Sequence, residues 1–206
     1  MKGKQMGFRL VGVATAMAIA VGTSGCAQLL GGGDKAVPTF DLTAPSDFRA
    51  PRSSTAQLVV AAPSALQVLD TERIVVEPKP GQVAYLEKAQ WSDRLPALFQ
   101  ARLIQSFENG SRGRAVGRAG DAITPDYTLL TDIRTFGIQA FDGAPEAVVE
   151  VYARIVGSSS GRIVAGRLFT ARVAAAGTAG PDATQALDAA SDKIFVEIVG
   201  WASGHY

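Results

Sequence analysis

Residues 147–156 read AVVEVYARIV, and this stretch decides the fold. Every second residue from Val149 to Ile155 is apolar, and the residues between them are charged or aromatic. A period of two is typical of a β-strand that buries one face and exposes the other to water. The stretch therefore predicts a strand in a sheet with one packed face and one wetter face.

Two further β-type stretches flank this strand, at residues 127–141 and 162–173. An Asp-Gly pair at 142–143 and a Ser-Gly pair at 160–161 lie at the two reversals, where glycine reaches a positive φ at little cost. Together the three stretches predict an antiparallel meander. Shorter strands are expected before it, within residues 57–86.

The first strand of the meander changes the parity of its apolar residues part-way along. Tyr127, Leu129 and Ile133 share one parity, whereas Phe136 and Ile138 take the other. One extra residue in a strand shifts the side chains after it to the opposite face. We therefore expect a β-bulge, near Gly137.

Two segments have the period of a helix instead. In residues 92–109 an apolar residue recurs at every fourth position from Leu95 to Phe107, and Asn109-Gly110 supplies a C-terminal stop. Residues 182–201 carry a second apolar stripe that ends at Trp201. The predicted fold is α/β, a two-layer sandwich with a mainly antiparallel sheet and two amphipathic helices packed on one face.

The N-terminus has the layout of a secretory signal, with basic residues, about a dozen apolar residues and then small residues. Its ending, Thr23-Ser24-Gly25-Cys26, resembles the lipobox of bacterial lipoproteins. That resemblance implies a signal peptide at residues 1–25 and a diacylglycerol-linked Cys26 as the mature N-terminus and membrane anchor. The usual leucine three residues before the cysteine is Thr23 here. The alternatives are an ordinary secreted protein or an uncleaved anchor with a thiol at position 26.

Within residues 26–56, the stretch from Gly31 to about Ala56 is rich in Gly, Pro, Ser and Asp and shows little periodicity. This composition predicts a lipidated N-terminus followed by a flexible tether, with a short edge strand near residues 39–42. The folded domain is then expected at residues 57–206. Ala27 follows the cysteine, and by analogy with enterobacterial sorting this favours the outer membrane, with the domain on the periplasmic side of the envelope.

The composition bounds the function. The 20 Lys and Arg residues nearly balance the 19 Asp and Glu residues, so no concentrated basic face for nucleic acid is predicted. The one cysteine excludes an intrachain disulfide. The one histidine, His205, excludes a His-based triad or a multi-histidine metal site, and no Ser-x-x-Lys, Gly-x-Ser-x-Gly, P-loop or dinucleotide motif is present. We expect a protein that is not an enzyme, with no cofactor and no metal.

Two aromatic residues before the first helix are candidates for partner binding. Tyr85 and Trp91 either anchor the entrance of that helix or present aromatic surface to a partner, where such residues often dominate the binding energy. The sequence leaves both alternatives open.

The string from Gln90 to Pro96, QWSDRLP, resembles the hallmark segment of the ABC-type transport auxiliary lipoproteins, the PqiC-like family. The C-terminal half is similar too, with DYTL at 126–129, IRTF at 133–136 and ALDAA at 186–190 before a terminal Trp. The resemblance covers about residues 37–201. Gly137 departs from it, because relatives often carry an acidic residue there.

The resemblance implies an auxiliary lipoprotein that works beside an ABC permease and an MCE-domain substrate-binding protein, moving phospholipid or other hydrophobic cargo across the envelope. The alternative is a stand-alone structural lipoprotein of the cell envelope that binds peptidoglycan or an envelope synthase. A lipid carrier with its own cavity is a third interpretation. Whether the chain forms a homo-oligomer stays open.

Overall fold

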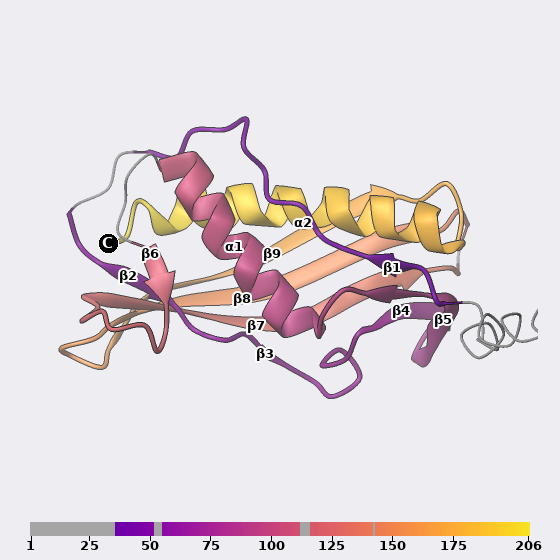
Figure 1. Cartoon of the computed structure of the whole chain (residues 1–206), viewed down its shortest axis with the longest axis horizontal. Coiled ribbons are helices and arrows are strands. Elements are labelled where there is room, and N and C mark those ends of the chain that lie inside the picture. The colour runs from indigo at the N-terminus through magenta and orange to yellow at the C-terminus, as the bar shows by residue number, and fades with distance from the viewer. Residues whose placement is uncertain (1–35, 52–54, 112–115, 142) are drawn as a thin grey trace, which may run out of the picture. The chain divides into compact units, whose positions relative to one another are not determined.

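The computed structural model describes residues 36–51, 55–111, 116–141 and 143–206 (Figure 1). Its contacts divide the chain into Met1–Ala36 and a folded unit, Val37–Tyr206.

The predicted meander is the centre of the sheet. It consists of β7 (Tyr127–Gln139), β8 (Glu146–Gly157) and β9 (Ile163–Ala174), paired antiparallel in chain order. Gly143 and Gly161, at the two predicted reversals, have positive φ angles of 129° and 63°. The alternation in β8 is confirmed, because Ala147, Val149, Val151, Ala153 and Ile155 are fully buried while the residues between them are mostly half-buried.

The bulge in β7 exists, but its predicted position is wrong. The register with β8 shifts between Ile133 and Thr135, so Arg134 is the extra residue and Gly137 stays paired with Val148. The physical reason for glycine at 137 is a different one. A Cβ there would lie 2.9 Å from the carbonyl oxygen of Val75, so only glycine lets the neighbouring strand approach.

Three short strands run parallel to β7 along its other edge, one after another. They are β2 (Leu58–Val60), β3 (Ser64–Ala65) and the middle of β4 (Arg73–Lys79). β4 then turns into the antiparallel β5 (Gln82–Trp91), while β1 (Thr39–Phe40) pairs with β5 and β6 (Val116–Arg118) pairs with β2. Within the described residues the sheet has nine strands. The strand predicted at 82–86 thus continues to Trp91.

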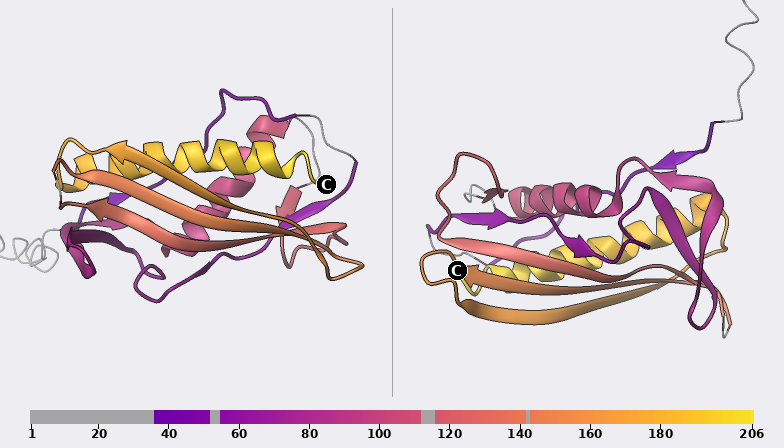
Figure 2. Two further views of the ribbon diagram at one scale, coloured as in Figure 1. Left: turned by 180° about the vertical axis from the view of Figure 1, so that it is seen from behind. Right: turned by 90° about the horizontal axis from the view of Figure 1, so that it is seen from below.

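Both helices lie on the same face of this sheet (Figure 2). α1 (Leu95–Ser111) passes the stop predicted at Asn109-Gly110, and α2 (Gly180–Ala202) contacts β8, β9 and α1. The two-layer α/β sandwich with a mainly antiparallel sheet is therefore confirmed. Among the described residues no helix lies on the opposite face of the sheet.

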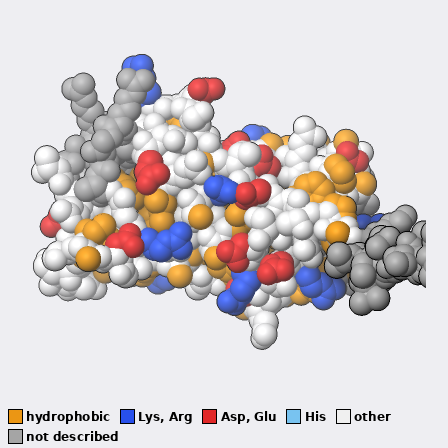
Figure 3. Space-filling model, viewed as in Figure 1, with side chains coloured by type: hydrophobic (Ala, Val, Ile, Leu, Met, Phe, Trp, Pro, Cys, Tyr) orange, Lys and Arg blue, Asp and Glu red, His pale blue; other side chains and the backbone are white. Residues whose placement is uncertain are grey.

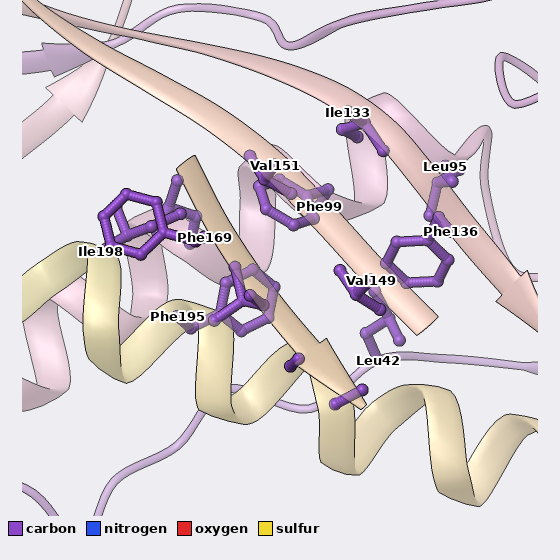
Figure 4. Packing of buried hydrophobic residues seen from close by; sticks show 14 of the residues in the cluster. Leu42, Leu95, Phe99, Ile133, Phe136, Val149, Val151, Phe169, Phe195 and Ile198 are labelled. Atoms are coloured by element: carbon purple, nitrogen blue, oxygen red, sulfur yellow. The ribbon is translucent and has the colours of Figure 1, made fainter. Parts of the chain in front are cut away.

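The core lies between the helix layer and the meander (Figure 4). The stripe predicted for α1 is buried along its whole length, and Phe99 meets Phe195 of α2 with ring centroids 4.9 Å apart. Phe169 of β9 packs edge-on against Trp201 at 5.5 Å. Burial of this apolar area supplies the main driving force for the fold.

The prediction of a flexible tether is wrong for residues 37–51. This segment, called the strap below, lies against both helices, and Leu42 within it is only 1% exposed. Its composition resembles that of a linker, but a few apolar side chains without any period fix it to the body. The predicted edge strand near residues 39–42 is present as β1.

Candidate functional site

Cys26, the predicted lipid anchor, lies outside the described residues, and its lipidation stays a prediction. The strap is the described segment that follows it. The strap lies between the predicted anchor and α1 in the sequence, and it contacts both helices.

The strap is fastened to α2 by hydrogen bonds. The backbone N–H of Thr43 donates to Oδ1 of Asp188 at 2.7 Å, and the Thr43 hydroxyl bonds both carboxylate oxygens at 3.1 and 3.0 Å. The same hydroxyl lies 3.5 Å from Oδ1 of Asp192, one turn further along the helix. One threonine thus bridges two carboxylates on α2.

These two carboxylates are electrostatically coupled. Burial, and secondarily the negative charge of Asp188, raise the pKa of Asp192 above its ordinary value, and the hydrogen bond from Thr43 opposes the shift. Ionisation of Asp192 is therefore disfavoured overall in the folded state, although the hydrogen bond from Thr43 in the strap favours the ionised form.

The strap also holds α1. Asp41 forms an ion pair with Arg102, and the Asn109 side-chain amide donates to the carbonyl of Pro45 at 3.1 Å. Phe48 lies so close to Gly110 that a Cβ on Gly110 would be 2.4 Å from the Phe48 ring. The strap is therefore built into the fold at both helices.

Trp91 is a core residue and is not available to a partner. Its side chain is 1% exposed, and its ring packs edge-on against Phe136 with centroids 5.9 Å apart and planes at 83°. Its backbone N–H donates to the carbonyl of Glu72 at 2.7 Å. Of the two alternatives that the sequence left open, the structure supports the packing role for this residue, because Trp91 ends β5 with its side chain turned inward.

Tyr85 is half-buried and partly accessible. The Arg73 guanidinium lies over its ring, 3.7 Å from the centroid, and its hydroxyl donates to the carbonyl of Val68 at 3.3 Å. The structure therefore does not bring Tyr85 and Trp91 together as one aromatic surface. A contact of Tyr85 with a partner stays a prediction.

A cluster that the sequence reasoning did not single out lies on the helix-free face of the sheet. Tyr152 of β8 has the guanidinium carbons of Arg134 and Arg154 at 4.8 and 5.9 Å from its ring centroid. Leu168, its partner on β9, is 44% exposed. Tyrosine and arginine are the residue types enriched where proteins bind one another. The sequence signal for this cluster was the alternation in residues 147–156, which places Tyr152 and Arg154 on the face exposed to water.

A small apolar hollow of about 220 Å³ lies beside this face, between the β4–β5 hairpin and β7. Leu66 and Val83 at its edge are 70% and 51% exposed. Small-molecule sites usually measure about 300–1,000 Å³. The hollow therefore suits one apolar side chain better than a whole lipid.

A wider hollow of about 820 Å³ lies at the far end of the meander, lined mainly by serine, threonine and glycine. Its one carboxylate, Asp126, already accepts a hydrogen bond from the backbone N–H of Gln57 at 2.8 Å. That carboxylate thus holds β2 against β7.

The described residues do not bring together the side chains that a metal site needs. No group of three or more His, Cys, Asp or Glu side chains among them is placed to hold a metal ion. Nδ1 of His205 lies 2.7 Å from the carbonyl oxygen of Trp201, and the His205 ring lies beside the Trp201 indole.

On the helix-bearing face, acidic and basic side chains are interspersed (Figure 3). No described helix is both long and apolar enough to cross a membrane.

Comparison with known proteins gives the family. Residues 40–199 match the ABC-type transport auxiliary lipoprotein components, and this range begins inside the strap and ends in the last turns of α2. The chain belongs to this family. The family consists of envelope-associated transport components and is not a family of enzymes.

One curated relative is similar to this auxiliary lipoprotein over most of the chain. It is 37% identical over 183 residues to an uncharacterized protein of Bradyrhizobium diazoefficiens, and the match covers 86% of this chain and 48% of that one. The chain thus spans about half the length of this curated relative.

Two crystal structures have a similar fold. A protein from Xanthomonas campestris is 30% identical, with a TM-score of 0.69 over 82% of this chain and 94% of that chain. An uncharacterized protein at 15% identity has a TM-score of 0.62 over 80% of this chain and 100% of that chain, which shows the fold alone.

Proposed function

We propose that this protein is a lipid-anchored, non-enzymatic adaptor of an ABC transporter that moves phospholipid or other hydrophobic cargo across the cell envelope. Cys26 carries the anchor, an MCE-domain protein and an ABC permease are the partners, and the anchor lies in the outer membrane, with the domain on its periplasmic side. The observation that carries the proposal is the family match, which spans nearly the whole folded unit, strap included.

The geometry supports an adaptor in two ways. The strap ties the segment after the predicted anchor to both helices through Asp41, Thr43 and Pro45, so any pull on the anchor reaches the helix layer. The helix-free face of the sheet carries Tyr152, two arginines and exposed Leu168, which suits a protein partner.

Co-purification tests the partner. The full chain, solubilised from membranes in mild detergent, is expected to bring down the MCE-domain protein and the permease encoded beside it, and its deletion is expected to give the same lipid-transport defect as deletion of either. A protein that instead sediments with peptidoglycan, and whose loss leaves lipid transport intact, would support the structural-lipoprotein alternative.

Two matched variants test the anchor. Cys26→Ala is expected to leave the protein in the soluble periplasm, because one residue carries the acyl chains, and mass spectrometry of the wild-type N-terminus is expected to show the diacylglycerol adduct. Ala27→Asp keeps the anchor and tests sorting, with a shift toward the inner membrane expected. An unmodified wild-type Cys26 would contradict the anchoring part of the proposal.

A further inference from the structure

β9 is a long free edge of the sheet. Within the described part of the chain it pairs with β8 alone, and it has 12 residues, whereas β1 and β6, at other edges, have two and three (Figure 2). A long edge strand presents a row of unpaired N–H and C=O groups to any chain that can add to it.

The ladder identifies which groups face outward. The N–H of Ala175 donates to the carbonyl of Pro145 at 2.8 Å, in the same register as the β8–β9 pairs. Hydrogen-bonded and non-hydrogen-bonded pairs alternate in an antiparallel ladder. The odd-numbered residues from 165 to 173 therefore bond β8, while Gly166, Leu168, Thr170 and Arg172 direct their N–H and C=O groups to the free edge.

The other side of β8 agrees with this assignment. The N–H of Ser158 donates to the carbonyl of Asp126 at 2.9 Å, which puts the even-numbered residues of β8 in bonds with β7. The odd-numbered residues of β8 therefore form the backbone hydrogen bonds to β9. The four outward residues of β9 are also all exposed.

The edge lacks most of the devices that usually block strand addition. β9 contains no proline and no lysine, and its one register irregularity lies at the end near Ile163. Leu168 and Val164 are 44% and 50% exposed beside the free backbone. Natural edge strands are commonly protected by proline, by lysine or by bulges. Most of this edge is therefore open to addition.

The charge of the edge is of one sign. Residues 162–174 include Arg162, Arg167 and Arg172 and no carboxylate. Arg172 lies 2.7 Å from Glu146 of β8, and Arg167 lies 3.7 Å from Glu197 of α2, but both arginine side chains stay about half exposed. An added strand with carboxylates would meet this charge favourably, whereas a second copy of β9 would set arginines against arginines.

We propose that an extended acidic segment of a partner protein adds to β9 as a further strand, bonded to the outward backbone groups of Gly166, Leu168, Thr170 and Arg172. Its apolar side chains lie beside Leu168 on the helix-free face, and its carboxylates lie beside Arg167 on the helix side. Strand addition is an established mode of peptide recognition. The inference deepens the proposed function by naming its docking edge, and rests on that function only for the identity of the partner.

A synthetic peptide tests the edge without the natural partner. The probe alternates valine with threonine and glutamate (TVEVTVEV), and its control replaces each glutamate with lysine. The full chain in detergent is expected to bind the acidic peptide at least about tenfold more tightly than the basic one, and less so at high salt. Equal affinity for both peptides, or none for either, would overturn the proposal.

Thr170 supplies a matched pair of variants. Thr170→Pro removes one outward N–H without breaking a β8 bond, a position where an edge strand tolerates proline. It is expected to weaken binding about tenfold, whereas Thr170→Ala keeps the N–H and stays within about twofold of wild type. Unchanged binding by a folded Thr170→Pro variant would contradict the proposal.

Hydrogen exchange of the wild-type chain keeps the test independent of folding in the variants. Bound peptide is expected to slow exchange at Leu168 and Thr170 and to leave Phe169 and Ala171, which already bond β8, unchanged. Equal change at all four residues, or at none, argues against strand addition. Dimers of the free chain that are abolished by Thr170→Pro would show that a second copy occupies the edge, and would also overturn the proposal.

The same variants separate this inference from the proposed function. If the MCE-domain protein co-purifies equally well with wild type and with folded Thr170→Pro, the function stands and the docking edge is wrong. If the acidic peptide binds as described and no transporter component co-purifies, the edge stands and the proposed partner is wrong.

Discussion

Gly110 lies where the strap crosses α1, and the absence of a side chain there is a packing requirement. A Cβ at this position would be 2.4 Å from the ring of Phe48, while a Cβ at Gly200 in α2 would meet nothing within 4 Å. Both glycines are helical, so the two sites differ mainly in their surroundings.

Alanine at the two sites is expected to have opposite effects on stability. Gly200→Ala should raise the free energy of unfolding by about 0.5–1 kcal/mol, because alanine costs less backbone entropy in a helix. Gly110→Ala should lower it by about 1–3 kcal/mol, because the strap must shift to make room. Denaturant unfolding of both variants checks this, and a stabilising Gly110→Ala would mean that the strap moves without cost.

Trp91 gives a second test at this scale, because its assignment as a core residue makes a quantitative prediction. Trp91→Ala is expected to lower the stability by about 3–5 kcal/mol, the cost of emptying a large buried site. Tyr85→Phe removes one hydrogen bond of a half-buried side chain and should cost less than about 1.5 kcal/mol. A Trp91→Ala variant of wild-type stability that loses only partner binding would contradict the assignment.

At the scale of elements, the strap is held to α2 by a pair of carboxylates that repel each other. Because the pKa of Asp192 is raised in the folded state, that state binds more protons than the unfolded chain between the two pKa values. Stability therefore falls as the pH rises through that window, and the full penalty is present above the folded pKa.

Asp192→Asn is expected to remove this penalty. The variant should be more stable than wild type at pH 7 by less than about 1 kcal/mol, since the group is only partly buried. The difference should disappear below the unfolded pKa. Asp188→Asn is the control, and it should destabilise the protein because Asp188 accepts the Thr43 N–H and hydroxyl. Thermal unfolding between pH 3 and 8 measures both, and a less stable Asp192→Asn at pH 7 would contradict the sign.

Elements with a local period were predictable, and those without one were not. The stripe from Leu95 to Phe107 and the alternation at 147–156 give α1 and β8 directly, because each segment buries one of its own faces. The strap has no period. It is ordered by contacts with residues far along the chain, such as Thr43 with Asp188, and single apolar residues such as Leu42 look like those of a linker.

The lack of a local period also limited the prediction of the candidate site. Trp91 is the last residue of β5, and no repeat in the sequence predicts which way its ring points. The strands parallel to β7 are two to seven residues long, and their register depends on partners about 60–70 residues away. The free edge of β9 follows only from the order of all the strands in the sheet, and no single segment of the sequence predicts that order.

At the scale of the whole molecule, the folded unit begins at the strap, about 20 residues before the boundary expected from composition. The strap contributes buried Leu42, half-buried Phe40 and the β1 pairing that covers part of the edge of β5. A chain without these groups exposes apolar surface on both helices and an unpaired strand edge.

Two truncations test this boundary. A chain that begins at residue 37 is expected to unfold at the same temperature as the chain without its predicted signal. A chain that begins at residue 57 should lose on the order of 3–5 kcal/mol, because burial of one leucine alone contributes about 1.5–3 kcal/mol, and it should aggregate more readily. If residues 37–51 were the tether that their composition suggests, both truncations would unfold alike, and the load from a membrane anchor would enter the domain at β2 rather than through the helices.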